Sequence, residues 1–351
     1  MKISVVIRSK DEADRLRLTL ASLARQSTPA EVVVVNDGSS DHTAEVMAEA
    51  AANGLDLVGV HHSAPAGRSA AANAGATSAT GDILIFLDGD TLAEPDFVAK
   101  HLAQHCVRDG LIVRGETYHL RCTRVFLDPE TGTPKPGEED RVARMSANER
   151  ARALVTRDQI RGAFAEIDRR AQPGIYPGFG PRKLFDLEMA ALRENRDCSV
   201  LWAAASGANQ SLARSAFLEA GGFHPRISIN EHRELALRLC RSGLRMAPTD
   251  ARSYHMTHRS GWRDPLEDLE WEAVFYDAHP EAVVALLPLF WQSISDHSPL
   301  PAEARIMSLP ELAQQAARYE GLQGRDTVRA AHLAASAANG QSSAGARASA
   351  A

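Results

Sequence analysis

The sequence predicts an α/β fold, in which helices flank a mostly parallel sheet and a further helical region follows. The first observation is three short runs of β-branched and other apolar residues, at 3–7, 31–36 and 82–87. Runs of this kind are typical of strands buried on both faces of a parallel sheet. The second observation is the helical spacing of leucine and alanine between the runs, because strands that alternate with helices indicate a doubly wound sheet.

The remaining elements are expected in chain order. The first half should contain a helix around Leu16, Leu20 and Leu23, an alanine-rich helix after residue 41, a weaker strand near 55–60 and a helix over 67–79. Beyond residue 107 the pattern changes. A loop rich in Pro, Gly and acidic residues is expected at 128–140, charged helices at 141–170 and an irregular segment at 172–181. Helical patterns return around 215–220, around 231–242 and from about 266.

Composition narrows the function. A chain of 351 residues with 44% hydrophobic and 24% charged residues has the composition of a globular protein with one large core. Its net charge of -6 argues against general nucleic-acid binding. The four cysteines are scattered, which predicts reduced thiols rather than disulfides or a zinc site. We expect no signal peptide, and the longest apolar run, 282–291, contains a proline and is too short to span a bilayer. The expected location is cytoplasmic. If the acceptor is lipid-linked, the protein could instead act as a peripheral protein at the inner face of the membrane.

Two carboxylates follow the third strong strand, in Asp88-Gly89-Asp90. Acidic side chains on a tight turn suit a hard divalent cation, which prefers oxygen ligands and keeps positions open for phosphate. Gly89 would let the backbone approach a ligand closely. The alternative is a solvated turn, since Asp and Gly are common at strand ends.

Polar residues also follow the second strand and precede the helix at 67–79. Asp37 leaves the strand and can accept hydrogen bonds from a base or ribose, whereas the neighbouring Ser and Asp residues are explained by helix capping. Gly67 and Arg68 begin a helix, where backbone amides and a cation can face phosphates. The alternative is a small-residue helix packed on the sheet with Arg68 solvated.

In their order along the chain, these motifs resemble family 2 glycosyltransferases of the GT-A fold. The likeness continues downstream at 206–209 (Ser-Gly-Ala-Asn), 221–223 (Gly-Gly-Phe) and 231–239. The resemblance implies an inverting, hexosyltransferase-type enzyme that moves a sugar from a nucleotide diphosphate sugar to a glycan, lipid-linked or small-molecule acceptor.

The resemblance also implies roles for particular residues. Asp88, Asp90 and His255 would hold Mn²⁺ or Mg²⁺, with Asp88 and Asp90 as the DXD motif. The nucleotide would lie against Ile7, Arg8, Ser9, Glu12, Asp37, Gly67, Arg68, Asp88 and Gly89. Relatives carry Asn-Glu where this chain has Asp11-Glu12, so the base remains open.

The catalytic base is the main departure from the family. Relatives begin the helix after the Gly-Gly-Phe motif with Glu-Asp, and this chain has Glu231-His232. Both groups can be tuned to act near neutral pH, so Glu231 is the first candidate, His232 the second and Glu234 a third. The alternative is that the acidic residues only complement the first turn of a helix.

Four residues are candidates for contact with the sugar or acceptor: Trp202, Gly207, Glu231 and His258. Trp202 suits sugar stacking or core packing equally. His255 and His258 follow an expected strand, and each is a candidate ligand or a structural residue.

The expected organisation is a GT-A domain at 1–265, a helical extension at 266–338 and a disordered Gly/Ser/Ala-rich tail at 339–351. Within the domain, 1–106 would bind the nucleotide and 107–265 the acceptor. The chain lacks the spanning helices and Gln/Arg-x-x-Arg-Trp motif of processive synthases, which predicts a non-processive enzyme. Homo-oligomer formation through the extension stays open. The alternatives are a sugar nucleotidyltransferase, disfavoured because no Gly-rich triphosphate loop follows the first strand, and a non-catalytic nucleotide-sugar binding module.

Overall fold

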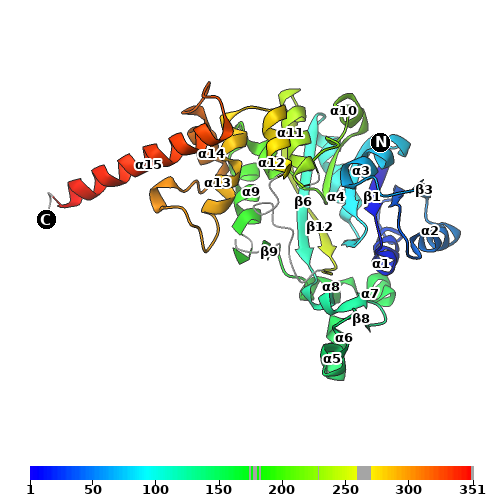
Figure 1. The fold of residues 1–351 in the computed structure, drawn as a ribbon. Helices are drawn as coiled ribbons and strands as arrows, with labels where there is room; N and C mark the ends of the chain where they lie inside the picture. The colour runs from blue at the N-terminus through cyan, green and yellow to red at the C-terminus, as the bar shows by residue number, and fades with distance from the viewer. Residues whose placement is uncertain (174, 177–179, 182, 228, 259–269, 349–351) are drawn as a thin grey trace. The chain divides into compact units, whose positions relative to one another are not determined.

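The central feature of the fold is a mixed eight-stranded sheet (Figure 1). The computed structural model describes residues 1–173, 175–176, 180–181, 183–227, 229–258 and 270–348. The strand order is β3-β2-β1-β4-β11-β6-β12-β5. The strands are β1 (Ile3–Ser9), β2 (Glu31–Asp37), β3 (Leu57–His62), β4 (Ile83–Asp88), β5 (Thr91–Ala93), β6 (Leu111–His119), β11 (Gln210–Ala213) and β12 (Arg245–His255). The chain divides into two units, Met1–Gly174 with Ala205–Gly261, and Ile175–Ala204 with Trp262–Ala351. The sheet belongs to the first unit.

The predicted α/β fold is confirmed. Strand β1 pairs in parallel with β2 and β4, strand β2 pairs in parallel with β3, and β6 pairs in parallel with β12. Strand β11 is antiparallel to both β4 and β6. The four predicted strands correspond to β1 to β4, and their carboxyl ends share one edge of the sheet.

Alternating side chains of the central strands build a core on each face of the sheet. On one face, Val5 and Ile7 pack with Leu16 and Leu20 of α1 (Ala13–Leu23). On the other face α3 (Arg68–Ser78) lies so close that a Cβ added at Gly75 would stand 2.6 Å from Val6 Cγ1. The other helices of this unit near the sheet are α2 (Thr43–Ala52), α4 (Phe97–Val107), α10 (Arg214–Glu219) and α11 (Glu231–Arg241).

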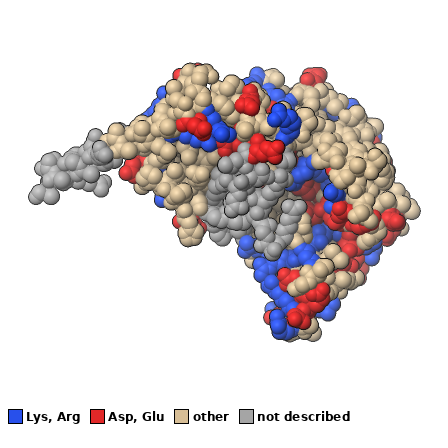
Figure 2. Space-filling view, in the orientation of Figure 1, with Lys and Arg blue, Asp and Glu red and all other residues tan. Residues whose placement is uncertain are grey.

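A small lobe of short elements follows β6. It contains η1 (Arg121–Val125), β7 (Phe126–Asp128), β8 (Thr133–Pro134), α5 (Glu139–Ala143), α6 (Ala147–Ala153), α7 (Arg157–Gly162) and α8 (Phe164–Arg170). Ser146 with Glu149, and Thr156 with Gln159, form the capping boxes that begin α6 and α7. Charged side chains of both signs cover this lobe at the bottom of Figure 2, as a solvated surface would. The predicted loop at 128–140 contains the β7–β8 hairpin.

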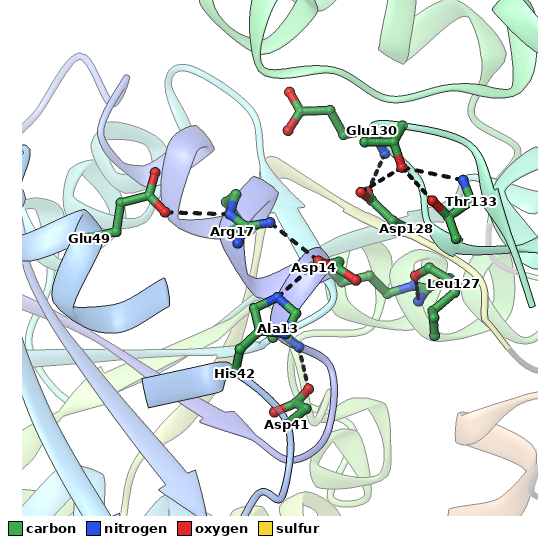
Figure 3. Close-up of polar contacts among 12 residues, drawn as sticks. Ala13, Asp14, Arg17, Asp41, His42, Glu49, Leu127, Asp128, Glu130 and Thr133 are labelled. Atoms are coloured by element: carbon green, nitrogen blue, oxygen red, sulfur yellow. Dashed lines mark hydrogen bonds and ion pairs between the residues drawn. The ribbon is translucent and has the colours of Figure 1, made fainter. Parts of the chain in front are cut away.

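Polar contacts join α1 to its neighbours (Figure 3). Ala13 N donates to Asp41 Oδ2 at 2.9 Å, which fixes the start of α1 against the turn before α2. Arg17 lies 3.2 Å from Asp14 and 3.6 Å from Glu49 of α2. The buried Arg15 guanidinium reaches the lobe, where Nη1 donates to Leu127 O at 2.9 Å. These contacts connect α1 to the turn before α2, to α2 itself and to the lobe that follows β6.

The second unit is helical. It contains β9 (Ile175–Tyr176), β10 (Gly180–Pro181), α9 (Lys183–Glu194), η2 (Leu201–Ala204), α12 (Glu270–Ala278), α13 (Ala282–Ser293), η3 (Ala302–Ala304), α14 (Leu309–Ala317) and α15 (Arg325–Ala348). The buried Glu272 carboxylate receives Arg325 at 3.1 Å and Arg329 at 2.5 Å. The apolar run at 282–291 is the core helix α13, and among the described helices we find none with the length and apolar character to cross a bilayer.

Two details of the predicted organisation differ. The segment 175–204 groups with the C-terminal helices rather than with the sheet, while the predicted boundary at 265/266 lies outside the described residues. The tail at 339–351, which was predicted to be disordered, belongs to α15 as far as Ala348.

Candidate functional site

The predicted site residues of the first unit gather at the carboxyl edge of the sheet. Asp88 ends β4, and the turn through Gly89 brings Asp90 before β5. His255 ends β12, the neighbour of β5, and Glu231 begins α11. A Cβ at residue 89 would stand 2.3 Å from Glu12 Oε1 and 3.0 Å from Ser9 Cβ, so a larger residue would displace these neighbours of the turn.

Asp90 is the centre of a cluster of metal-type donors. Its Oδ2 lies 3.2 Å from His255 Nε2 and 2.9 Å from His258 Nε2. Thr91 Oγ1 donates to Asp90 Oδ1 at 3.0 Å and orients the carboxylate. One donor atom from each of Asp90, His255 and His258 lies within 4.8 Å of the others, which fits a single divalent cation.

The electrostatics of this cluster come from burial and from the imidazoles. Burial alone would raise the pKa of Asp90, but the two histidines outweigh it and hold this pKa well below the usual range. Burial lowers the pKa of His258, whereas Asp90 outweighs burial at His255 and raises its pKa. The pKa of Glu12 is well above its usual value because of burial and of Asp90 and Asp88. A cation would offset this crowding of carboxylates.

The cluster contains two residues of the predicted ligand set, Asp90 and His255, together with His258, which the sequence offered both as a candidate ligand and as a contact for the sugar or acceptor. Asp88, the other carboxylate of the motif, pairs with Arg8 Nε at 3.0 Å and lies 3.7 Å from Arg68, and its role as a metal ligand stays a prediction. The turn at Gly89 directs the two carboxylates to different neighbours, one toward arginines and one toward histidines.

Arg8 connects the two halves of the site. Its Nη1 donates to Glu231 Oε1 at 2.8 Å while its Nε holds Asp88. Burial would lower the pKa of Arg8, yet Asp88 and Glu231 outweigh burial and raise it. Burial would raise the pKa of Glu231, but Arg8 and then His232 keep it well below the usual value. Glu231 is therefore an ionised, oriented carboxylate.

The other candidate bases have different surroundings. Arg233 Nη1 lies 2.8 Å from His232 Nε2, and since a guanidinium only donates, Nε2 accepts and the ring proton lies on Nδ1. Burial lowers the pKa of His232 to about 4. Its Nδ1 would stand 3.0 Å from a Cβ at Gly207, so these two predicted residues are neighbours. Glu234 is buried and pairs with Arg238 through two contacts of 2.7 Å, a structural role.

Asp37, the predicted nucleotide contact at the end of β2, is hydrogen-bonded to neighbouring protein groups. Asp37 Oδ1 receives His62 Nδ1 at 2.7 Å and Ala66 N at 2.8 Å, and its Oδ2 receives Gly67 N at 2.9 Å. Burial would raise the pKa of Asp37, but these donors outweigh it and lower the pKa. A nucleotide would have to share Asp37 with these groups. Arg68, which begins α3, is about half exposed.

Three further predicted residues are placed by packing. Ile7 is fully buried in the core of the sheet, so its backbone is what borders the edge. Ser9 is buried beside Gly89. Trp202 lies in the second unit, where its ring is edge-on to Phe275 at 5.9 Å, the core alternative of the two that the sequence left open.

Two residues beside the Asp90 cluster were not predicted. The buried Arg15 Nε donates to Met256 O at 3.2 Å and so supports the segment that carries His258. His119 ends β6 with its Nδ1 3.3 Å from His255 Nδ1. Burial lowers the pKa of His119 to about 3. Neither residue belongs to a sequence motif, and only the pairing of β6 with β12 would have indicated His119.

Part of the chain is similar in sequence to known glycosyltransferases. Residues 4–130 match the sequence model of Glycosyl transferase family 2. The chain is 36% identical over 117 residues to the uncharacterized glycosyltransferase YfnE of Bacillus subtilis, which is 33% of this chain and 30% of that protein. It is 34% identical over 130 residues to the undecaprenyl-phosphate 4-deoxy-4-formamido-L-arabinose transferase of Klebsiella pneumoniae, 36% of this chain and 39% of that protein. The matched regions are thus about a third of the length of these relatives.

A solved structure shows the same fold. The crystal structure of GalNAc-T7 with UDP, GalNAc and Mn²⁺ has a TM-score of 0.50 to this chain at 18% identity, covering 80% of this chain and 50% of that one. At this identity the likeness concerns the fold alone.

Proposed function

Because residues 4–130 match the sequence model of Glycosyl transferase family 2, we propose that the chain transfers a sugar from a nucleotide diphosphate sugar to an acceptor nucleophile. The transfer is a single, non-processive displacement that inverts the anomeric carbon. The observation that carries the proposal is the cluster of Asp90, His255 and His258 at the carboxyl edge of the sheet, where ligands bind in open α/β folds.

Asp90, His255 and His258 are the residues that would hold a divalent cation. The fit rests on three donor atoms within 4.8 Å and on a carboxylate already oriented by Thr91. When bound there, the cation supplies Lewis-acid stabilisation of the departing diphosphate. One carboxylate with two imidazoles favours Mn²⁺ or a similar transition ion over Mg²⁺, which prefers oxygen ligands.

Glu231 is the proposed base. One of its oxygens is held by Arg8, which leaves the other to accept the proton of the acceptor hydroxyl. As the oxygen of the acceptor hydroxyl forms a bond to the anomeric carbon, the bond from this carbon to the diphosphate oxygen breaks and the nucleotide diphosphate leaves with its electron pair. Asp88, Arg8 and Arg68 lie near one another and are the residues that would contact the donor. His232 carries its proton on Nδ1, and its Nε2 is engaged by Arg233, so this imidazole is not the proposed base.

The alternative is a non-catalytic nucleotide-sugar binding module. The Arg8–Glu231 ion pair is the observation in its favour, because a carboxylate with a lowered pKa is a weaker base. Turnover decides between the two functions. A binding module would bind the donor but show no transfer or hydrolysis, and Glu231→Gln would leave its behaviour unchanged.

The test is a thermal-shift screen of UDP, GDP, dTDP and CMP with Mn²⁺ or Mg²⁺, followed by hydrolysis assays with sugar conjugates of the nucleotide that binds. A ligand that binds only the native state raises the melting temperature. We expect at least one nucleotide to do so with Mn²⁺ and not in EDTA, and Asp90→Asn to abolish the effect. A shift that persists in Asp90→Asn would contradict the assigned metal site.

A further inference from the structure

Two histidines meet where strands β6 and β12 end. The strands run parallel, and their register places His119 opposite His255. The two rings are perpendicular, with an interplanar angle of 89° and centroids 5.3 Å apart. Their Nδ1 atoms lie 3.3 Å apart, within hydrogen-bond distance. One of these nitrogens must therefore donate and the other accept.

The other nitrogen of His255 decides which one donates. His255 Nε2 faces the cluster, 3.2 Å from Asp90 Oδ2. The Asp90 carboxylate can only accept, so without a cation Nε2 donates to it. With a cation bound to Nε2, the ring proton of His255 would lie on Nδ1, so that His255 would be the donor to His119. Ligating histidines generally donate this second N–H to an acceptor that fixes the tautomer and the ring orientation.

The backbone of His119 is anchored independently of the cluster. His119 N donates to Gln172 O at 2.7 Å, and Gln172 N donates to His119 O at 2.9 Å. The strand end is therefore held from the side opposite β12, and the ring is presented from a fixed position. Thr91 orients Asp90 in a comparable way, so two of the three donors have a dedicated partner.

We propose that His119 is a positioning residue of the metal centre, which accepts the Nδ1 proton of His255 and so presents His255 Nε2 to the cation. The inference rests on the proposed function for the existence of that centre. It adds a residue outside the ligand set and the DXD motif, and it assigns the tautomer through which His255 binds.

The experiment titrates the full chain with MnCl₂ and follows free Mn²⁺ by electron paramagnetic resonance. His119→Leu removes the acceptor, whereas His119→Asn places an amide oxygen near the position of Nδ1. Tyr118→Phe is the control, because Tyr118 precedes His119 in β6 and its side chain points to the other face of the sheet. We expect His119→Leu to weaken Mn²⁺ binding about 10- to 100-fold. His119→Asn should stay within about threefold of the wild type because it restores the acceptor, and the control should be unchanged.

The outcomes separate this inference from the proposed function. Failure of the wild type to bind Mn²⁺ would remove the metal centre and with it both proposals. Wild-type binding that is unchanged in His119→Leu, or equally weakened in His119→Asn, would overturn the role of His119 alone. Should His119→Leu not fold, the ¹⁵N shifts of the wild-type histidines loaded with diamagnetic Zn²⁺ decide. A proton on His255 Nδ1 supports the inference, and ligation through Nδ1 overturns it.

Discussion

Arg8 and Glu231 form a buried ion pair of 2.8 Å between the end of β1 and the start of α11, 223 positions apart in the sequence. The same guanidinium holds Asp88 at 3.0 Å. One side chain therefore neutralises a carboxylate on the donor side and the carboxylate that we propose as the base. Loss of either partner of the pair would leave a buried charge without its counter-ion.

The first prediction concerns the stability of this pair. Arg8→Gln leaves the buried Glu231 without its cation and removes one of the two arginines near the partly exposed Asp88. Removing one partner of a buried ion pair costs about 3–5 kcal/mol. The double variant Arg8→Gln/Glu231→Gln should be more stable than Arg8→Gln alone, because the unpaired charge on Glu231 is removed. Urea unfolding of the wild type, both single variants and the double variant measures this coupling. Additive effects of the two substitutions would show that the contact does not exist in solution.

A second prediction separates the two carboxylates of the Asp88-Gly89-Asp90 turn. Asp90→Asn, His255→Ala and His258→Ala should each abolish the Mn²⁺-dependent rise in melting temperature. Asp88→Asn should retain it, because Asp88 faces Arg8 and Arg68. Differential scanning fluorimetry in MnCl₂, MgCl₂ and EDTA measures the difference, and Mn²⁺ should stabilise more than Mg²⁺ at equal concentration. Equal loss in all four variants would restore the two-carboxylate site that the sequence suggested.

The third prediction is a pH dependence of stability. Burial lowers the pKa of His101 to about 3 and that of His105 to about 4, and both rings contact Ser211 Oγ at 2.8 Å. The unfolded chain binds protons at these histidines near pH 6.5, whereas the folded chain does not. Stability is therefore full above about pH 6.5 and falls as the pH drops toward the folded values.

Urea midpoints measured between pH 7.5 and 5 test this dependence. His105→Asn removes one of the two groups and should flatten the pH profile compared with the wild type. His42→Asn, at an exposed histidine for which no comparable burial exists, is the control and should leave the slope unchanged. A wild-type profile that is level between pH 7.5 and 5 would contradict the neutral, buried state of these rings.

The fourth prediction concerns the base. Glu231→Gln should lower donor turnover about 10²- to 10⁴-fold, the range for loss of a general base. Donor binding should change little, since Asp88, Arg8 and the cation site remain. His232→Ala should have a smaller effect because Nε2 of His232 is occupied by Arg233. Single-turnover hydrolysis, with binding measured separately, distinguishes the roles. A larger loss in His232→Ala than in Glu231→Gln would make the imidazole the base.

The strands and the acidic turn were predictable because they depend on local pattern. Val32 to Val35 form an unbroken apolar run, and Asp88-Gly89-Asp90 follows another such run. Both signals depend on neighbours in the chain, and the structure places both where the pattern indicated. The glycine and serine content of residues 339–351 indicated disorder, whereas α15 continues to Ala348.

The contacts that complete the site depend on tertiary structure. His258 joins Asp90 because β12 and β5 are neighbours in the sheet, and His119 meets His255 because of a register that no single segment encodes. The division of Asp88 from Asp90 likewise depends on an arginine from β1 and on two histidines, one at the end of β12 and one beyond it. The residue types indicated which side chains could bind a metal or transfer a proton. Which of these side chains lie close together depends on the order of the strands in the sheet.

The most direct test of the account is anomalous diffraction at the manganese edge from crystals grown with Mn²⁺ and the nucleotide diphosphate identified by the screen. The account predicts an anomalous peak within coordination distance of Asp90, His255 and His258, with the diphosphate completing the coordination. A manganese peak elsewhere, with these three side chains still hydrogen-bonded only to one another, would contradict it.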